Sequence, residues 1–399
     1  MSGTTATLRT AGLPSGYPAE IDSTVKVRFV AGLLANMSER SVNALKYLGG
    51  VEQFSFDNPK LEWVEDDVWA RRPTVTGTPL SSGGTAFTVT AQAHRYPVGS
   101  IFFNATQGEY VRVNAIADAN TLTVTRDLGT VLGSTPAWAS TDEILVTGFS
   151  MHEDDVWTYR PTSIFAMPYN FTQAQHVAVQ ATYRRMETRL YAPPGSDLDY
   201  QAANTVAEQF VAIEEAAIHG TRFEGSSTVP SMAGGLKFYV TSANGSQVTD
   251  LNSAALARKD VDDILQGLYY KVGMERMART ILTGAWGKRK ISSFFSAAER
   301  LGPGANEAGV AIDRFNTDFG PVDVLLHTAV LKNELLFVRK ENHRLGVFGT
   351  LGAPHLIQNV GPASVGDGPR TRRAFYADWS MINSGPEAEG KIQEISTSA

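Results

Sequence analysis

The sequence predicts an α+β protein that carries a small all-β domain inserted into a long loop. Three observations support this prediction. The pentapeptide Glu-Asp-Asp-Val-Trp occurs twice, at Glu65–Trp69 and at Glu153–Trp157. Between the copies, short runs of alternating apolar and polar residues are separated by turn residues, as in strands. After the second copy come a long amphipathic helix and further strands and helices that lack a regular strand–helix alternation.

The repeated pentapeptide is the most informative local feature, because five identical residues that include Trp rarely recur by chance. We interpret the two copies as the exit and re-entry points of one two-stranded element, with the insert held between them. This arrangement favours a protein that reaches toward its neighbours over one that closes around a substrate.

Composition excludes several classes of protein. The chain has 399 residues, 43% hydrophobic and 19% charged, which fits a folded protein with two or three cores. The net charge of −6 excludes a strong overall attraction to nucleic acid or anionic membranes. Cysteine is absent, which removes disulfides and thiolate chemistry and suits a reducing cytoplasm. No apolar run approaches about 18 residues and no signal peptide precedes the chain, so we expect a soluble protein.

The first 60 residues are predicted to form an arm. Residues 1–24 are rich in small residues, Pro and Gly and should be extended without a core of their own. Apolar residues at helical spacing within 25–50 predict a short helix before Gly49-Gly50. Residues 51–69 alternate and should be extended.

The insert over residues 72–150 is predicted to be a small barrel-like or sandwich-like domain that folds nearly independently. Gly, Asn and Asp separate its segments at the spacing typical of antiparallel strands. Five strands are expected: Thr85–Thr90, Val98–Phe103, Glu109–Ile116, Asn120–Arg126 and Glu143–Thr147.

A long helix over residues 196–220 is the strongest helical signal. The preceding stretch, Ser163–Ala192, is predicted to be extended, and it ends at Pro193-Pro194-Gly195. One apolar stripe follows at spacings of four, three and four residues, and Gly220 ends the helix. The stripe consists of Val206, Phe210, Ile213 and Ala217.

The remainder of the chain mixes both kinds of element. Helices are predicted around Val261–Val272, which Gly273 stops, and over Lys288–Arg300. Strands are predicted at Leu236–Thr241, Arg279–Thr283, Val322–His327, Leu335–Arg339, Arg373–Ile382 and Lys391–Ile395.

No catalytic constellation is present in the sequence. It lacks a phosphate-binding G-x-x-x-x-G-K-[ST], a G-x-G-x-x-G between strand and helix, an H-E-x-x-H and a G-x-S-x-G. His219, in the last turn of the long helix, is interpreted as a structural cap. We therefore expect no enzyme activity, no catalytic residues and no cofactor, and we assign no residue as a metal ligand.

The acidic triplets of the repeat are the one group of ionisable side chains in the sequence that could form a functional site. They comprise Glu65, Asp66 and Asp67 in the first copy and Glu153, Asp154 and Asp155 in the second. If the two strands pair, the carboxylates repel one another and need nearby cations. Three interpretations remain open: solvated surfaces, salt bridges to arginines of another subunit, or a divalent metal site. The arginines in question are Arg184, Arg185 and Arg189.

The order of these features resembles the major capsid protein of tailed bacteriophages, with the Hong Kong 97-like fold. More closely, it resembles a phage capsid family with a β-rich insertion in the extended loop. Five stretches carry the resemblance: Leu61-Glu62-Trp63, the returning strand Gln175–Thr182, the helix core Glu208–Gly220, the strand pair Asp313–His327, and the C-terminal Gly385–Ile395.

The resemblance implies a domain map. Residues 1–60 would be the N-terminal arm and 61–195 the extended loop, which contains the insert 72–150. The peripheral domain, with the spine helix, would take residues 196–245 and 371–399. The axial domain would take residues 246–370.

The resemblance also implies a function. The chain would self-assemble through hexamers and pentamers into the icosahedral shell that encloses phage DNA. Its further partners would be a portal, scaffold or decoration proteins, and packaged double-stranded DNA held non-specifically, with no membrane. It would reside in the virion after assembly in the host cytoplasm. The alternative is a virion receptor- or carbohydrate-binding protein that uses the β-rich insert.

Overall fold

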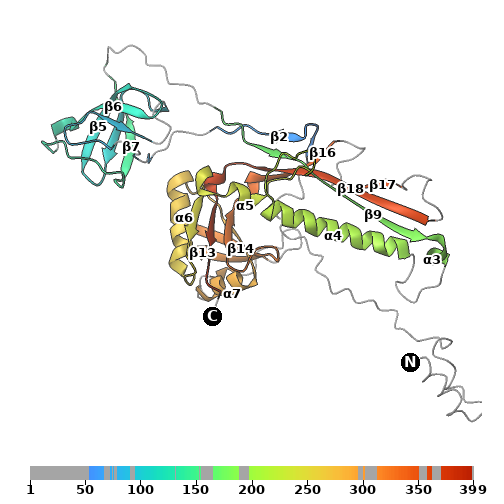
Figure 1. The fold of residues 1–399 in the computed structure, drawn as a ribbon. Helices are drawn as coiled ribbons and strands as arrows, with labels where there is room; N and C mark the ends of the chain where they lie inside the picture. Colours follow the sequence, from blue (N-terminus) through green and yellow to red (C-terminus); the bar gives the residue numbers. More distant parts are fainter. Residues whose placement is uncertain are drawn as a thin grey trace, which may run out of the picture. The chain divides into compact units, whose positions relative to one another are not determined.

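The computed structural model describes most of the chain beyond Phe54 (Figure 1). The predicted helix within residues 25–50, and the predicted arm up to residue 53, lie outside the described residues. The described ranges are 54–66, 72–73, 75, 79–89, 95–130, 132–151, 153, 165–187, 197–294, 300–301, 312–349, 357–361 and 370–397.

The chain divides into two compact units. The described part of the smaller unit comes from His176–Gln209 and Asn359–Tyr376, and the larger unit takes the other described residues. Three long elements contribute to both units, because the boundary falls inside them: β9 (Gln173–Thr182), α4 (Asp197–His219) and β18 (Arg370–Asn383).

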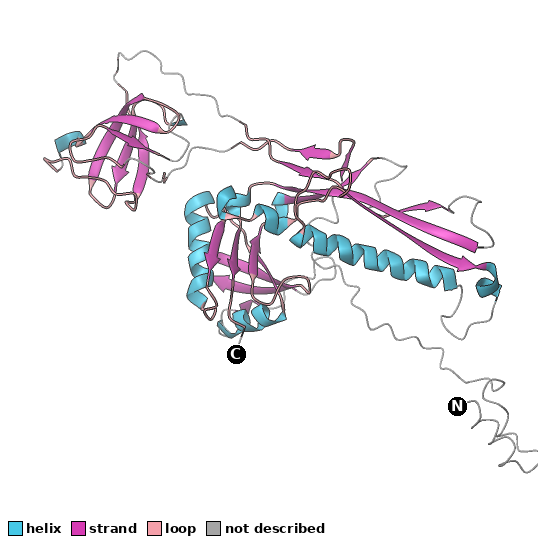
Figure 2. Cartoon of the chain, in the orientation of Figure 1, coloured by secondary structure: helices cyan, strands magenta, loops and turns pink. Residues whose placement is uncertain are grey.

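Between the two pentapeptides, the chain forms a five-stranded antiparallel sheet in the order β3-β6-β5-β4-β7 (Figure 2). All five predicted strands are present, and their bounds differ from the prediction by two residues at most. They are β3 (Ala86–Thr88), β4 (Ser100–Asn104), β5 (Glu109–Ile116), β6 (Thr121–Thr125) and β7 (Ile144–Phe149).

The insert has a hydrophobic core of its own. Alternate residues of β4 and β5 point inward, and loop residues such as Tyr96 and Trp138 complete the cluster. Phe102 lies edge-on to Phe87 at 5.8 Å between ring centroids and to Tyr96 at 5.0 Å, the arrangement that aromatic rings favour. The sheet can therefore bury its apolar face without help from the rest of the chain, while the limits at 72 and 150 remain a prediction.

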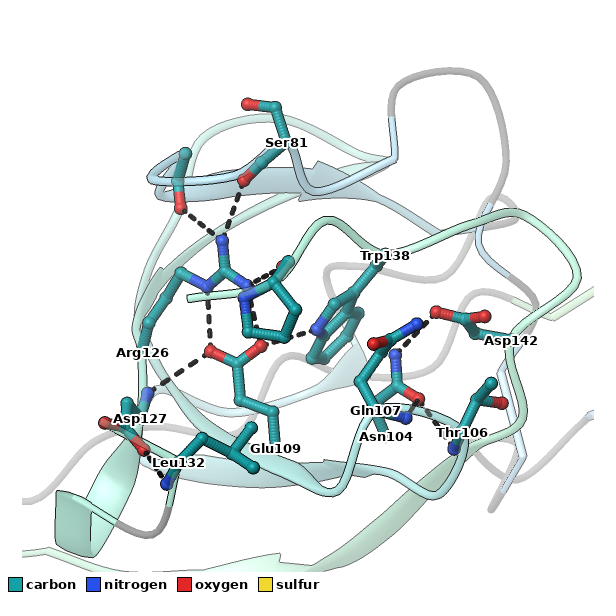
Figure 3. A network of polar contacts seen from close by, with 12 residues as sticks. Ser81, Asn104, Thr106, Gln107, Glu109, Arg126, Asp127, Leu132, Trp138 and Asp142 are labelled. Carbon is teal, nitrogen blue, oxygen red and sulfur yellow. Dashed lines mark hydrogen bonds and ion pairs between the residues drawn. The ribbon is translucent and has the colours of Figure 1, made fainter. Parts of the chain in front are cut away.

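A buried polar network closes one side of this core (Figure 3). Arg126 binds the Glu109 carboxylate through two bonds, of 2.8 Å from Nε and 2.6 Å from Nη2. Trp138 Nε1 donates to the same carboxylate at 2.7 Å, as does the backbone N–H of Asp127 at 3.3 Å. Arg126 also donates to the carbonyl of Ser81 at 2.7 Å. Because both charges are paired and bonded, their burial is compatible with a stable insert.

The second sheet is seven-stranded and mixed, in the order β10-β19-β15-β11-β14-β13-β12. On one face, α6 (Arg258–Val272) and α7 (Ala285–Phe294) contribute Val261, Ile264, Leu265, Leu268 and Ile291 to the core. The strands are β10 (Gln247–Asp250), β11 (Thr280–Thr283), β12 (Arg300–Leu301), β13 (Ile312–Thr317), β14 (Gly320–Leu326), β15 (Leu335–Val338) and β19 (Gly390–Gln393).

The opposite face of this sheet is covered as well. Leu282 of β11 and Leu336 of β15 pack there with Ile218 of α4 and with Leu236 of α5 (Leu236–Tyr239). All residues of β11 and β15 are consequently buried, which explains why β15 is a continuous apolar run and why β11 has apolar residues side by side at Ile281 and Leu282.

A third sheet runs along the long helix (Figure 1). It orders β1 (Phe54–Phe56), β16 (His343–Phe348), β18 and β17 (Gln358–Gly361), and β9 also pairs with β18. In the larger unit, Ile213 and Ala217 of α4 pack with Trp379, which is fully buried. Phe210, which is partly buried, packs against the same cluster, so three of the four residues of the predicted helical stripe face this sheet.

A two-stranded ribbon completes the described sheets. It pairs β2 (Lys60–Glu62) with β8 (Tyr169–Phe171) and continues through a bridge between Glu65 and Ala166.

Within the described part of the chain, no helix has the length and apolar character needed to cross a membrane. Short helical turns occur at η3 (Leu128–Thr130), η4 (Ser242–Asn244), η5 (Lys340–Asn342) and η6 (Pro386–Ala388).

Three sequence predictions were wrong in detail. The strand expected at Leu236–Thr241 is the short helix α5, and Leu236 and Val240, one helical turn apart, are both buried against β11, β14 and β15. The extended stretch expected up to Ala192 gives way at Tyr183 to the helix α3 (Tyr183–Glu187). The helix α7 begins and ends earlier than predicted.

Candidate functional site

The ribbon at the first pentapeptide has two distinct faces. The register pairs Lys60 with Phe171 and Glu62 with Tyr169, and the Glu65–Ala166 bridge continues it. Side chains alternate between the faces of a strand. Leu61, Trp63 and Glu65 therefore share one face, and Glu62 and Val64 share the other. Figure 1 shows the ribbon beside the label β2.

Glu65 is bonded within its own chain. Its Oε1 atom accepts a hydrogen bond of 2.8 Å from Trp63 Nε1 and one of 2.9 Å from the Gly385 backbone N–H. Gly385 has a φ of +56°, in the left-handed region, and precedes η6. The first acid of the repeat thus connects the ribbon to the turn between β18 and β19.

Asn170 fixes the opposite strand of the ribbon. Its side chain is fully buried and makes four hydrogen bonds, so that all its polar capacity is used. Nδ2 donates to the carbonyls of Gly234 at 2.9 Å and Met381 at 2.8 Å. Oδ1 accepts from the N–H groups of Gly234 at 2.7 Å and Phe171 at 2.9 Å. Nothing in the local sequence singles out this residue.

The other face of the ribbon carries exposed apolar side chains beside charged ones. Val64, Phe165 and Met167 retain 59%, 60% and 63% of their accessible surface. The register places Val64 opposite Met167, and Phe165 lies two residues from Met167 on the same strand. On β2, two and four residues before Val64, Glu62 and Lys60 form an ion pair on this same face.

The remaining members of the acidic triplets are only partly described. Asp66 and Glu153 are exposed. Asp67, Asp154, Asp155, and the tryptophans at 69 and 157 lie outside the described residues. Whether the two triplets meet therefore stays a prediction. Within the described residues, no three His, Asp or Glu side chains are grouped so that they could hold a metal ion.

The candidate arginines lie in the smaller unit. Arg184 and Arg185 are exposed on α3, directly after β9, and Thr182 Oγ1 accepts from the Arg185 backbone N–H at 3.3 Å. Arg189 lies outside the described residues. Nearby, Gln180 Oε1 accepts hydrogen bonds from Arg370 and Arg372, at 3.3 and 3.2 Å. This end of the unit therefore concentrates positive charge.

Two buried His–Glu pairs were not anticipated from the sequence. His327 Nε2 lies 2.8 Å from Glu214 Oε1, and His343 Nε2 lies 2.6 Å from Glu389 Oε1. The Nδ1 atom of His327 accepts from the Ala329 N–H at 3.1 Å, which leaves Nε2 facing the Glu214 carboxylate. His219, which was predicted as a helix cap, has Nε2 at 2.6 Å from the Ala329 carbonyl.

His343 differs from His327 because both its nitrogens face oxygen atoms. Nδ1 lies 2.8 Å from Asn383 Oδ1, and Nε2 faces Glu389. Burial disfavours the charged ring, but the Glu389 carboxylate and the bond to Asn383 outweigh it and raise the pKa of His343 above its ordinary value. This pair joins the start of β16 to the residue before β19, and so links two sheets.

Comparison with known proteins identifies the family. The family model described as SU10 major capsid protein matches residues 14–371. Among curated proteins, none matches the sequence.

Solved structures show the fold independently. The capsid of the native GTA particle is similar with a TM-score of 0.51 and 12% identity, over 93% of this chain and 96% of that chain. The capsid of Cyanophage A-1(L) is similar with a TM-score of 0.50 and 10% identity, over 94% of this chain and 98% of that chain.

These comparisons confirm the predicted capsid fold and the structural role. They give no support to the receptor- or carbohydrate-binding alternative. The chain belongs to the SU10 major capsid protein family and is a structural protein of the phage virion that associates with its own copies into a shell, not an enzyme.

Proposed function

We propose that the chain builds an icosahedral shell from hexamers and pentamers, assembled in the host cytoplasm around double-stranded DNA. The supporting observation is that large apolar side chains are exposed at separate places. One group is on the ribbon, one on α3, and one at the end of α6, where Tyr269 and Tyr270 are 42% and 50% exposed. A closed shell needs several different contacts per subunit, because it extends in two dimensions.

The proposed domain roles follow the predicted map. Residues 1–60 serve as the arm, 61–195 as the extended loop, 196–245 with 371–399 as the peripheral domain, and 246–370 as the axial domain. The separate core of the insert and the single helix α4 along a long sheet support this map. One feature does not follow this map. The strand β19 belongs to the C-terminal segment 371–399, but it pairs in the seven-stranded sheet with strands of residues 246–370.

The acidic triplets are proposed to pair with arginines of a neighbouring copy. Among the acids of the triplets that the structure describes, Asp66 and Glu153 are exposed, which supports this role. Arg184 and Arg185, exposed on α3, are the proposed cations, with Arg189 beyond them.

We propose that DNA is held by confinement rather than by tight binding, because the chain is net acidic with a pI near 5.7. A shell that takes up DNA needs an entrance, so a portal is a further proposed partner. Scaffold or decoration proteins are proposed as assembly partners.

Electron microscopy of the purified protein tests the assembly. We expect closed particles or five- and six-fold rings, produced alone or after co-expression with a scaffold. Only a 43.1 kDa monomer under both conditions would refute the proposal. Particles from infected cells should also protect DNA from nuclease, whereas the free protein should bind DNA weakly even at low salt.

A further inference from the structure

The helix α7 carries an unbalanced positive charge (Figure 1). Its ten residues include three cations in succession and no acid. The helix α6, which packs on the same face of the seven-stranded sheet, also has three cations but has three acids among them. Two of these acids, Asp262 and Asp263, form ion pairs with cations four residues earlier. Ion pairs within the helix therefore neutralise much of the charge of α6 and none of that of α7.

The cations of α7 lie toward solvent. Ile291 is buried against the sheet, and Arg289, two residues earlier and therefore just over half a turn away, is exposed. Lys288 and Lys290, on either side of Arg289, are partly exposed. Lys290 Nζ lies 5.8 Å from the centroid of the Phe294 ring, and Lys288 has an interaction within the chain. The outer side of the helix thus presents Arg289 at its centre, with a lysine on each flank.

The strands beneath α7 do not balance this charge. The helix packs on β11 and β14, and the one acid in the sequences of these two strands is Asp323. Its neighbours Val322 and Val324 point into the core under α6 and α7, so Asp323 points to the opposite face. There it forms an ion pair of 2.6 Å with Arg314. The acid of β14 is therefore used on the other side of the sheet.

The side chains of α7 suit phosphate groups better than a protein surface. Besides the cations, the helix carries Ser292 and Ser293, and Arg, Lys and Ser are among the side chains that bind DNA phosphates. None of the large apolar side chains that are exposed in the described residues lies on α7. Leu326 and Leu331, 40% and 50% exposed, lie next to the start of the helix. A contact with a second copy would use these leucines, whereas the cationic face of α7 favours a polyanion.

We propose that α7 lies on the inner surface of the shell and contacts the phosphates of the enclosed double-stranded DNA. Arg289 and Lys290 supply the charge, and the contact does not depend on the base sequence. Because each copy contributes so few cations, each contact is weak, and it is repeated in every copy of the shell. This inference rests on the proposed enclosure of DNA and adds the surface that faces the DNA.

Photo-crosslinking in DNA-filled particles tests the contact directly, because the chain contains no cysteine of its own. Arg289→Cys, modified with an aryl azide, should form a covalent adduct with DNA on irradiation. Arg344→Cys with the same group is the matched control, because Arg344 is exposed on β16 and not on α7, and it should form none. An adduct of Arg289→Cys with a second copy of the chain, or equal DNA adducts from both variants, would overturn the proposal.

The salt dependence of DNA binding by the free subunit is a second test, which needs no particles. Each cation that contacts a phosphate contributes about 0.9 to the slope of the logarithm of affinity against that of salt concentration. Arg289→Ser/Lys290→Ser should therefore lower this slope by about 2, measured by fluorescence anisotropy with a short labelled duplex at low salt. Arg276→Ser/Arg344→Ser, at exposed arginines outside α7, is the control and should leave the slope unchanged. Equal slopes for the two double variants, or no detectable binding by the wild type, would refute the contact.

The outcomes separate this inference from the proposed function. If no particles that protect DNA form, the proposed function fails, whatever the free subunit binds. If such particles form but Arg289→Cys gives no DNA adduct, the shell encloses DNA and a surface other than α7 meets it.

Discussion

Glu109 and Arg126 form a doubly bonded ion pair inside the inserted domain, and their side chains are 0% and 4% exposed. Trp138 occupies a further lone pair of the same carboxylate. The insert therefore holds a charged pair in its interior, where the loss of one partner leaves the other charge without compensation.

Glu109→Ala should destabilise the insert by about 3–5 kcal/mol, because it leaves the Arg126 guanidinium buried and unpaired. Hydrogen exchange at the amides of β4, β5 and β6 measures this locally, since a chain with several cores need not unfold in one step. The control is Glu143→Ala, which removes the exposed ion pair with Arg72 and should cost less than about 1 kcal/mol. Equal effects would show that burial does not set the cost.

The two copies of the pentapeptide should respond differently to the same substitution. Glu65→Ala removes the acceptor of Trp63 Nε1 and the Gly385 N–H, and should cost about 1–3 kcal/mol. Glu153→Ala, at the exposed equivalent position, should change stability by less than about 0.5 kcal/mol. Faster hydrogen exchange at the Gly385 amide is the specific readout. Unchanged exchange there would contradict the assigned bond.

Local signals explain what could be predicted from the sequence. The strand Glu109–Ile116 has the predicted bounds because its alternation and the turns beside it lie within a dozen residues. The long helix has nearly its predicted bounds, since a stripe and a terminal Gly are also local features. The helix α5 was missed because Leu236 and Val240 are buried by distant elements rather than by a pattern of their own.

The roles within the candidate site depend on distant partners. The pentapeptide drew attention to Glu65, but its bond to Gly385 spans 320 residues and has no local signature. Asn170 was not singled out, because its partners Gly234 and Met381 are 64 and 211 residues away. Buried polar bonds of this range follow from the fold and cannot be read from spacing.

Asn170→Ala should destabilise the larger unit by about 3 kcal/mol or more, because it leaves buried backbone groups at Gly234 and Met381 unpaired. The melting temperature of the free subunit measures it. Asn114→Ala removes only an exposed bond to Thr125 and should leave the melting temperature nearly unchanged. A melting temperature of Asn170→Ala equal to that of the wild type would show that the four bonds contribute little.

The stability of the larger unit should depend on pH through His343. Its pKa is raised in the folded chain because the Glu389 carboxylate outweighs the opposing effect of burial. A raised folded-state pKa means that the folded chain binds the proton more tightly than the unfolded chain does. The resulting stabilisation is complete below the unfolded pKa, about 6.5, and is lost as the pH rises through the folded-state value.

Denaturant unfolding of the free subunit between mildly acidic and mildly alkaline pH measures this effect. The wild type should lose more unfolding free energy toward high pH than His343→Gln, which cannot take up the proton. His176→Gln is the control, because His176 is exposed on β9, and it should follow the wild type. A His343→Gln profile parallel to the wild type would show that the Glu389 pair is not charged in the folded chain. In that case the link between β16 and β19 is a neutral hydrogen bond.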